Sequence, residues 1–266
     1  MKISRAFRFI GLFLLIISLL SSCQWGKKRP APKGKNIICV VDFSDSKNVS
    51  QRLNFYGNVI KENIIPKLGP HDKITVIPID KASLTNSTDI LLKDLSSMNF
   101  IPDQASPMEE EQLTENNLKK YKETLSNDFE ESYKKAIDSR SEVNHATDVF
   151  GALEVIKGKL KPNDDNYIIL LSDMMNYSNT LNMEPNNSHF NSTTLERALS
   201  TVPGYNMPNT TALVLTGEQV EVTPAHFSLV QSFWTKYFNK NNIKLYDYNS
   251  GSVAKLNELM SLDITK

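Results

Sequence analysis

The sequence predicts an α/β domain with a doubly wound, mostly parallel central sheet and helices on both faces. Short, continuous runs of β-branched and aliphatic residues are typical of strands that are buried on both sides. These runs alternate along the chain with amphipathic segments of helical period. Because strands that alternate with helices pair in parallel through right-handed crossovers, this order favours one open sheet.

Five segments have the composition of strands, at 36–43, 73–80, 167–171, 211–215 and 243–248. The second contains Pro78, which has no N–H to donate, so we expect an edge position or a bulge there. In open α/β sheets, ligands bind beyond the carboxyl ends of parallel strands. The residues that follow these five segments are therefore the candidates for a site.

The segments between the strands have helical patterns. The segment 49–68 has apolar residues at spacings of three and four, and Pro66 is expected to end it. The mostly polar region 81–145 is interpreted as an insertion. Within it, the pattern of residues 109–139 predicts a long helix. Its apolar stripe is expected to pack on the sheet, with a partner-binding helix as the alternative. Further helices are expected at 147–160, 225–239 and 254–260, with a short one that ends near 199.

The first 22 residues have the organisation of an export signal. Three basic residues precede an apolar run at 9–20, which is shorter than the roughly 20 residues that span a bilayer. The sequence Leu20-Ser21-Ser22-Cys23 then resembles a bacterial lipobox, in which the cysteine is lipidated. We expect a lipoprotein signal at 1–22 and a lipid anchor at Cys23. An ordinary signal peptide or an N-terminal anchor helix is the alternative.

Charge divides the rest of the chain into a basic tether, 23–35, and an acidic domain, 36–266. Of the 30 basic and 30 acidic residues, eight basic residues and no acidic ones lie before residue 36, which leaves 22 against 30 in the domain. The tether suits anionic lipid head groups, and the acidic domain argues against nucleic acid as a partner. We expect a membrane-anchored lipoprotein of the bacterial cell envelope. Gln24 is not an aspartate, which slightly favours the outer membrane.

Oxygen-bearing side chains stand where a metal ion could be held. Asp42 ends the first strand and is followed at alternate positions by Ser44 and Ser46, Asp173 follows the third strand, and Thr147 begins a helix. If the strands are parallel, both aspartates reach the same edge of the sheet. Oxygen ligands favour Mg²⁺ or Mn²⁺ over zinc. The hydroxyl residues and Asp173 also have ordinary explanations, since the hydroxyls could cap helices and Asp173 could belong to a turn.

Together these residues resemble the metal-ion-dependent adhesion site of von Willebrand factor type A (VWA) domains, a Rossmann-like fold. That motif is D-x-S-x-S, a distant threonine and a distant aspartate, and the resemblance covers about 36–250. It implies that Asp42, Ser44, Ser46, Thr147 and Asp173 form the metal site, with the hydroxyls as neutral ligands and the aspartates often acting through water. It further implies a partner protein that offers a carboxylate to the ion. The family commonly has glycine at two positions that here are Asp45 and Met174.

The leading hypothesis is therefore a binding protein of an envelope, adhesion or secretion-linked complex. Two further classes of function stay open. A metal-dependent phosphohydrolase could use Asp42 as a nucleophile, but the usual D-x-D-x-T pattern has an aspartate where this chain has Ser44. A solute-binding lipoprotein would need two lobes, for which the chain is short. The leading expectation is therefore a protein that is not an enzyme.

Overall fold

The computed structural model describes residues 33–262, apart from 45–48, 81–82, 85–87, 101–106, 141–145, 163 and 218–221. The expected export signal, Cys23 and most of the tether lie outside the described residues. The same holds for Ser46 and for Asp45 of the D-x-S-x-S motif. What the sequence predicts for them stays a prediction.

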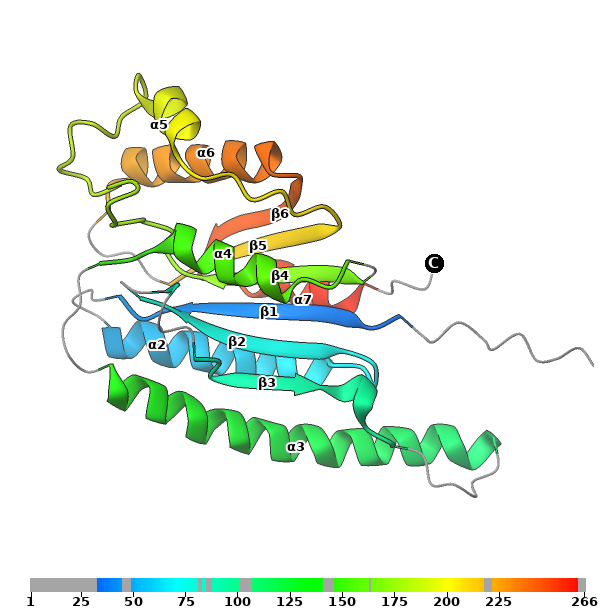
Figure 1. The fold of residues 1–266 in the computed structure, drawn as a ribbon. Helices are drawn as coiled ribbons and strands as arrows, with labels where there is room; N and C mark the ends of the chain where they lie inside the picture. Colours follow the sequence, from blue (N-terminus) through cyan, green and yellow to red (C-terminus); the bar gives the residue numbers. More distant parts are fainter. Residues whose placement is uncertain are drawn as a thin grey trace, which may run out of the picture. The chain divides into compact units, whose positions relative to one another are not determined.

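The described part of the chain forms one six-stranded sheet in the order β3-β2-β1-β4-β5-β6 (Figure 1). The strands β1, β2, β4, β5 and β6 run parallel to one another, and β3 is antiparallel to β2. The strands are β1 (Lys35–Asp42), β2 (Lys73–Ile79), β3 (Leu91–Asp94), β4 (Asp165–Leu171), β5 (Thr210–Thr216) and β6 (Ile243–Ser250). This sheet confirms the predicted fold class. The strand β3 was not predicted from the sequence, because it is only four residues long and half exposed.

Pro78 explains why β3 can be short. Since β2 lies between β1 and β3, the expected edge position is wrong for the strand as a whole. The Ile79 carbonyl accepts from the Phe43 N–H (3.0 Å), and the Val76 carbonyl accepts from the Ile90 N–H (2.8 Å), so alternate residues of β2 bond to opposite neighbours. The position without an N–H therefore faces the β3 side. Because β3 pairs with β2 only as far as Val76, no donor is needed at Pro78.

One face of the sheet is covered by a helical layer that includes a long helix. The predicted helix 49–68 is confirmed as α2 (Val49–Asn58), which continues as the π-helical η1 (Val59–Ile64) and the 3₁₀-helical η2 (Ile65–Lys67). The predicted long helix is α3 (Pro107–Ser139), which lies alongside α2 in Figure 1. Its stripe packs against η1 and η2 and shares one core with alternate residues of β1. The C-terminal helix α7 (Ala254–Ser261) also contacts η1.

The other face is covered by α4 (Val149–Lys159), α5 (Leu195–Thr201) and α6 (Pro224–Lys240). Its core contains the other set of β1 side chains and a cluster of aromatic rings, Phe150, Phe233, Trp234, Tyr237 and Phe238. Helices on both faces make the sheet doubly wound. None of the helices in the described part of the chain is long and apolar enough to cross a membrane.

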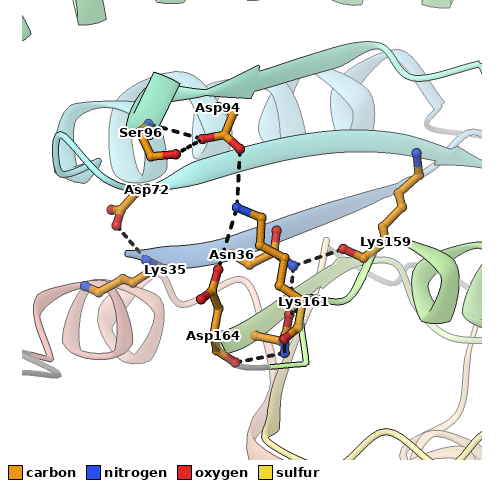
Figure 2. Close-up of polar contacts among 9 residues, drawn as sticks. Lys35, Asn36, Asp72, Asp94, Ser96, Lys159, Lys161 and Asp164 are labelled. Atoms are coloured by element: carbon orange, nitrogen blue, oxygen red, sulfur yellow. Dashed lines mark hydrogen bonds and ion pairs between the residues drawn. The ribbon is translucent and has the colours of Figure 1, made fainter. Parts of the chain in front are cut away.

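The amino ends of β1 and β4 are joined by a buried pair of asparagines. The Asn36 side-chain amide donates to the Asn166 side-chain oxygen (2.7 Å) and to the Lys159 carbonyl (3.1 Å; Figure 2). The Asn166 amide donates to the carbonyls of Lys161 (2.9 Å) and Asp164 (3.0 Å). The pair thus closes the connection from α4 to β4, at the end of the sheet that is opposite the candidate site.

Replacing Asn166 with alanine is expected to lower the free energy of unfolding by about 2–3 kcal/mol, because buried hydrogen-bonding groups lose their partner. Urea unfolding of the full chain measures this. The matched control is Lys157→Ala, an exposed position of α4, for which we expect a change within about 0.5 kcal/mol. An equally small change for Asn166→Ala would show that this network does not stabilise the domain.

Candidate metal centre

The two candidate aspartates lie at the same edge of the sheet. The strands β1 and β4 are adjacent and parallel, and Val41 lies opposite Leu171. Asp42, the last residue of β1, therefore lies beside Ser172, and Asp173 follows directly. Asp42 and Asp173 are 131 residues apart in the sequence, and the pairing of two buried strands brings them to the same edge.

The Asp42 carboxylate is buried and held at both oxygens. Its Oδ1 accepts a hydrogen bond from the Ser44 backbone N–H (2.9 Å), and its Oδ2 accepts one from the Ser172 hydroxyl (2.6 Å). The Ser172 hydroxyl oxygen in turn accepts from the Met174 N–H (2.8 Å). A side chain with both ends fixed is a preorganised ligand. Ser172 was not selected from the sequence; the only signal for it was a hydroxyl beside Asp173 at a strand end.

The Asp173 carboxylate is 17% exposed, and its Oδ1 accepts from the Met175 N–H (2.9 Å). Burial, and then the nearby charge of Asp42, raise the pKa of this carboxyl to about 6, while the Arg52 guanidinium opposes the rise. The two carboxylates are thus close enough to repel each other. A divalent cation between them would relieve this repulsion, so the residues present fit an ion of the Mg²⁺ type.

The turn after Asp173 has a strained backbone. Met174 has a φ of 62°, a left-handed conformation that costs a residue other than glycine about 1 kcal/mol or more. Its side chain is fully buried, and its carbonyl accepts from the Trp234 indole N–H (2.7 Å). This is a position at which the VWA pattern commonly has glycine. The surrounding core therefore holds Met174 in the conformation that glycine adopts without strain.

Thr147 is buried between the carboxyl end of β2 and the loop that follows β4. Its N–H donates to the Tyr177 carbonyl (3.1 Å), and its carbonyl accepts from the Tyr177 N–H (2.9 Å). The next residue, Asp148, donates its N–H to the carbonyl of Asp80, directly after β2. These bonds place Thr147 at the edge of the sheet that carries both aspartates.

The helix after Thr147 is capped by a different residue from the one expected. The helix α4 begins at Val149 instead of Thr147, and the Asp148 carboxylate accepts from the Gly151 N–H (3.0 Å) as its cap. The Val149 N–H donates to the buried Asn176 side-chain oxygen (2.9 Å), a second contact that sequence reasoning missed. The interpretation of Thr147 as a helix cap is therefore wrong, because the helix starts two residues later.

Four of the five predicted ligands can be placed. Asp42, Ser44, Thr147 and Asp173 lie at one edge, whereas Ser46 lies outside the described residues. Among the described residues, no group of three His, Cys, Asp or Glu side chains could hold a metal ion. The candidate centre consists instead of two carboxylates and neutral hydroxyls. Hydroxyl and carboxylate oxygens suit a hard cation such as Mg²⁺ or Mn²⁺ and not zinc.

Comparisons with known proteins bear on the fold. No protein-family model matches the chain, and no curated protein matches it. In fold, the chain is similar to VWA domains. A von Willebrand factor type A protein from Catenulispora acidiphila is 13% identical over 86% of this chain and 41% of its own length, with a TM-score of 0.40. The SpRpn10 VWA domain is 10% identical over 86% of this chain and 94% of its own, with a TM-score of 0.38.

A third solved structure is the proximal thread matrix protein 1 of the mussel byssus. It is 12% identical over 86% of this chain and 46% of its own length, with a TM-score of 0.40. This chain therefore spans less than half of the mussel protein and of the Catenulispora acidiphila protein. Similarities of this size describe the fold alone, so the candidate centre depends on the geometry given above.

The raised pKa of Asp173 predicts how the stability of the metal-free protein depends on pH. The native state holds this proton up to about pH 6, whereas the unfolded chain releases it near its ordinary value, so the native state binds more protons between the two. The contribution of Asp173 to stability therefore falls as the pH rises from about 4 to above 6. In EDTA, the Tm of Asp173→Asn should exceed that of the unmodified chain increasingly across this range.

Thermal unfolding of both proteins from pH 4.5 to 7.5 measures this difference, and the other titrating groups cancel because they are common to both. A difference that stays constant with pH would mean that the pKa of Asp173 is the same in the folded and the unfolded chain. A difference that shrinks as the pH rises would mean that Asp173 is stabilised as the carboxylate.

Proposed function

We propose that this chain is an exported, lipid-anchored binding protein with a VWA-like domain, and that it engages a protein partner through a Mg²⁺-type cation. The observation that supports the proposal is that Asp42 and Asp173 follow adjacent parallel strands at one edge of the sheet, the edge that also carries Ser44 and Thr147. The bound ion would supply an electrophilic centre that accepts a carboxylate from the partner.

The arrangement of this chain's own residues suits exchangeable binding. Asp42 and Asp173 are fixed by backbone and hydroxyl donors, so they do not need to reorganise when the ion enters. The remaining oxygens are neutral hydroxyls, which add no negative charge to that of the two aspartates. Since Mg²⁺ keeps several waters in proteins, one position can be exchanged for an oxygen of the partner.

The surroundings of Asp42 support binding over the phosphohydrolase alternative. The Asp42 carboxylate is fully buried and each of its oxygens accepts one hydrogen bond, which leaves a lone pair for an ion or its bound water but little freedom to reach a substrate. The second position of the motif is Ser44, where a phosphohydrolase would have its acidic residue. We therefore assign Asp42 to the metal and propose no catalytic residue.

The location that we propose follows from the first 35 residues. The signal-like segment 1–22, Cys23 and the basic tether would place the acidic domain at the surface of a bacterial envelope membrane. Replacing Cys23 with serine is expected to move the protein from the membrane fraction to the soluble fraction of the cell. Immunoblots of the two fractions measure this, and a protein that stays in the membrane fraction would contradict lipidation at Cys23.

The test of the function compares partner capture with and without the cation. The tethered chain is cross-linked in envelope membranes and purified in Mg²⁺ or in EDTA, beside the Asp42→Asn variant. We expect a protein that is retained by the unmodified chain in Mg²⁺ and lost both in EDTA and with Asp42→Asn. Capture that is the same in all three samples would contradict a metal-dependent interaction.

A further inference from the structure

A buried arginine lies beside the candidate metal centre, although no part of the predicted motif includes it. Arg52 is on α2, and its side chain is only 9% exposed. Its Nη2 donates to the Ser44 carbonyl (2.5 Å), and its Nη1 lies 4.0 Å from the Asp173 Oδ2. One guanidinium therefore contacts both the D-x-S segment and the second aspartate.

The fold makes room for this side chain. A Cβ at Gly217, just after β5, would lie 3.0 Å from the Arg52 Cγ and 3.5 Å from its Cδ. The Gly217 N–H donates to the hydroxyl of Tyr56 (3.1 Å), one helical turn after Arg52. The end of β5 thus fixes the residues of α2 that face the carboxylates. Packing of this kind restricts the conformations of the arginine and keeps its guanidinium beside its charged partners.

The charges of the described groups explain why an arginine is placed here. At neutral pH, Asp42 and Asp173 together carry two negative charges and Arg52 carries one positive charge, so these three groups sum to −1 without a metal ion. The charge of Arg52 also acts on the buried hydroxyls of Tyr56 and Tyr133, whose pKa values it lowers against the effect of burial. With a divalent cation, the sum for the ion and these three groups becomes +1, which one carboxylate from a partner would neutralise.

We propose that Arg52 is a built-in counter-cation of the Asp42–Asp173 pair, which stabilises the metal-free edge and competes with a divalent cation for Asp173. The competition rests on the metal centre of the proposed function, whereas the counter-cation role does not. Arg52 is a positioning residue, because it acts on the ion through Ser44 and Asp173. The consequence is a site whose metal affinity is lower than its ligands alone would provide.

The counter-cation role is tested without metal by a double-mutant cycle. The full chain, Arg52→Met, Asp173→Asn and the double variant are unfolded thermally in EDTA at pH 7.5. We expect Arg52→Met to lower the Tm by several degrees in the unmodified chain and by clearly less in the Asp173→Asn background, because the charge pair is then already absent. An equal loss in both backgrounds would mean that Arg52 only packs, and would overturn the proposal. If Arg52→Met does not fold, Arg52→Gln replaces it in the cycle.

The competition is tested by calorimetric titration of the same proteins with Mg²⁺. We expect the variant without the charge to bind Mg²⁺ several-fold more tightly than the unmodified chain. Arg52→Lys, which keeps the charge, should bind within about twofold of it. Unchanged or weaker binding by the neutral variant would overturn the competition, since Arg52 would then only position the Ser44 loop.

The two tests separate this inference from the proposed function. If neither the unmodified chain nor the neutral variant binds Mg²⁺ while the cycle shows coupling, the metal function is contradicted and Arg52 stands as a permanent counter-cation. If only the neutral variant binds Mg²⁺, the arginine takes the place of the cation in this chain. If Mg²⁺ binds to the unmodified chain and the cycle shows no coupling, the metal function stands and the Arg52 proposal fails.

Discussion

Replacing Asp42 with asparagine is expected to weaken Mg²⁺ binding by at least about 100-fold, since the ion loses a fixed charged ligand or the anchor of its water. In the metal-free protein at pH 7, the same change has two opposed effects on the Tm. Asparagine has nearly the shape of aspartate, and its side-chain oxygen can still accept from the Ser44 N–H. The repulsion between Asp42 and Asp173 is removed, but the asparagine NH2 group then faces the Ser172 hydroxyl, which loses the Oδ2 acceptor that Asp42 provides.

The measurement is a pair of thermal unfolding curves, in EDTA and in millimolar Mg²⁺, together with a calorimetric titration. The matched control is Asp247→Asn, which removes a carboxylate from β6 of the same sheet and should leave the Mg²⁺ response unchanged. If Asp42→Asn keeps the full Mg²⁺-dependent rise in Tm, the ion does not bind at this edge. In EDTA, a higher Tm for the variant would mean that the relief of the repulsion outweighs the lost Ser172 hydrogen bond, and a lower Tm would mean the reverse.

Replacing Trp234 with alanine is expected to lower the free energy of unfolding by about 4 kcal/mol, the usual cost of removing a large buried ring. Trp234 is fully buried, and its ring centroid lies 5.2 Å from that of Phe150 and 5.3 Å from those of Phe233 and Tyr237. The change also removes the donor to the Met174 carbonyl. Because Met174 is strained, its turn is then expected to relax and to move Asp173, which should weaken Mg²⁺ binding about tenfold or more.

Urea unfolding and a Mg²⁺ titration below the unfolding transition separate the two effects. Trp234→Phe keeps most of the apolar ring but not the N–H, so it should lose about 1–2 kcal/mol, while its Mg²⁺ affinity should fall nearly as far as that of the alanine variant. Full Mg²⁺ affinity in Trp234→Phe would show that the indole hydrogen bond does not hold the Asp173 turn.

The fold was largely predictable because its elements depend on local pattern. Buried strands such as β1 and β4 consist of continuous aliphatic runs, and α3 and α6 have clear helical stripes. The strand β3 was missed because four residues, of which Leu92 is 52% exposed, have no pattern of their own. The edge position expected for Pro78 was wrong for the same reason. The strand β3, which has no recognisable pattern, pairs with β2 only as far as Val76.

The site could be predicted mainly for those residues that lie at or directly after the end of a strand. Asp42 and Asp173 could be paired from the parallel order alone, because both strands end at one edge. Ser172, Asn176 and Arg52 could not be found in this way. Their roles depend on which side chain reaches which backbone group across elements that are distant in sequence, as when Arg52 reaches the Ser44 carbonyl. Thr147 was assigned to the right edge, but the start of its helix was two residues off because Asp148 is the better cap.

The central claim is that one divalent cation binds between the ends of β1 and β4, and the most direct measurement is an anomalous difference map from crystals of the chain grown with Mn²⁺. We predict a single strong peak within bonding or single-water distance of the Asp42 and Asp173 carboxylates, with hydroxyl oxygens of the motif serines and of Thr147 in its first shell. A map with no peak at this edge, or with the strongest peak elsewhere on the domain, would contradict the account.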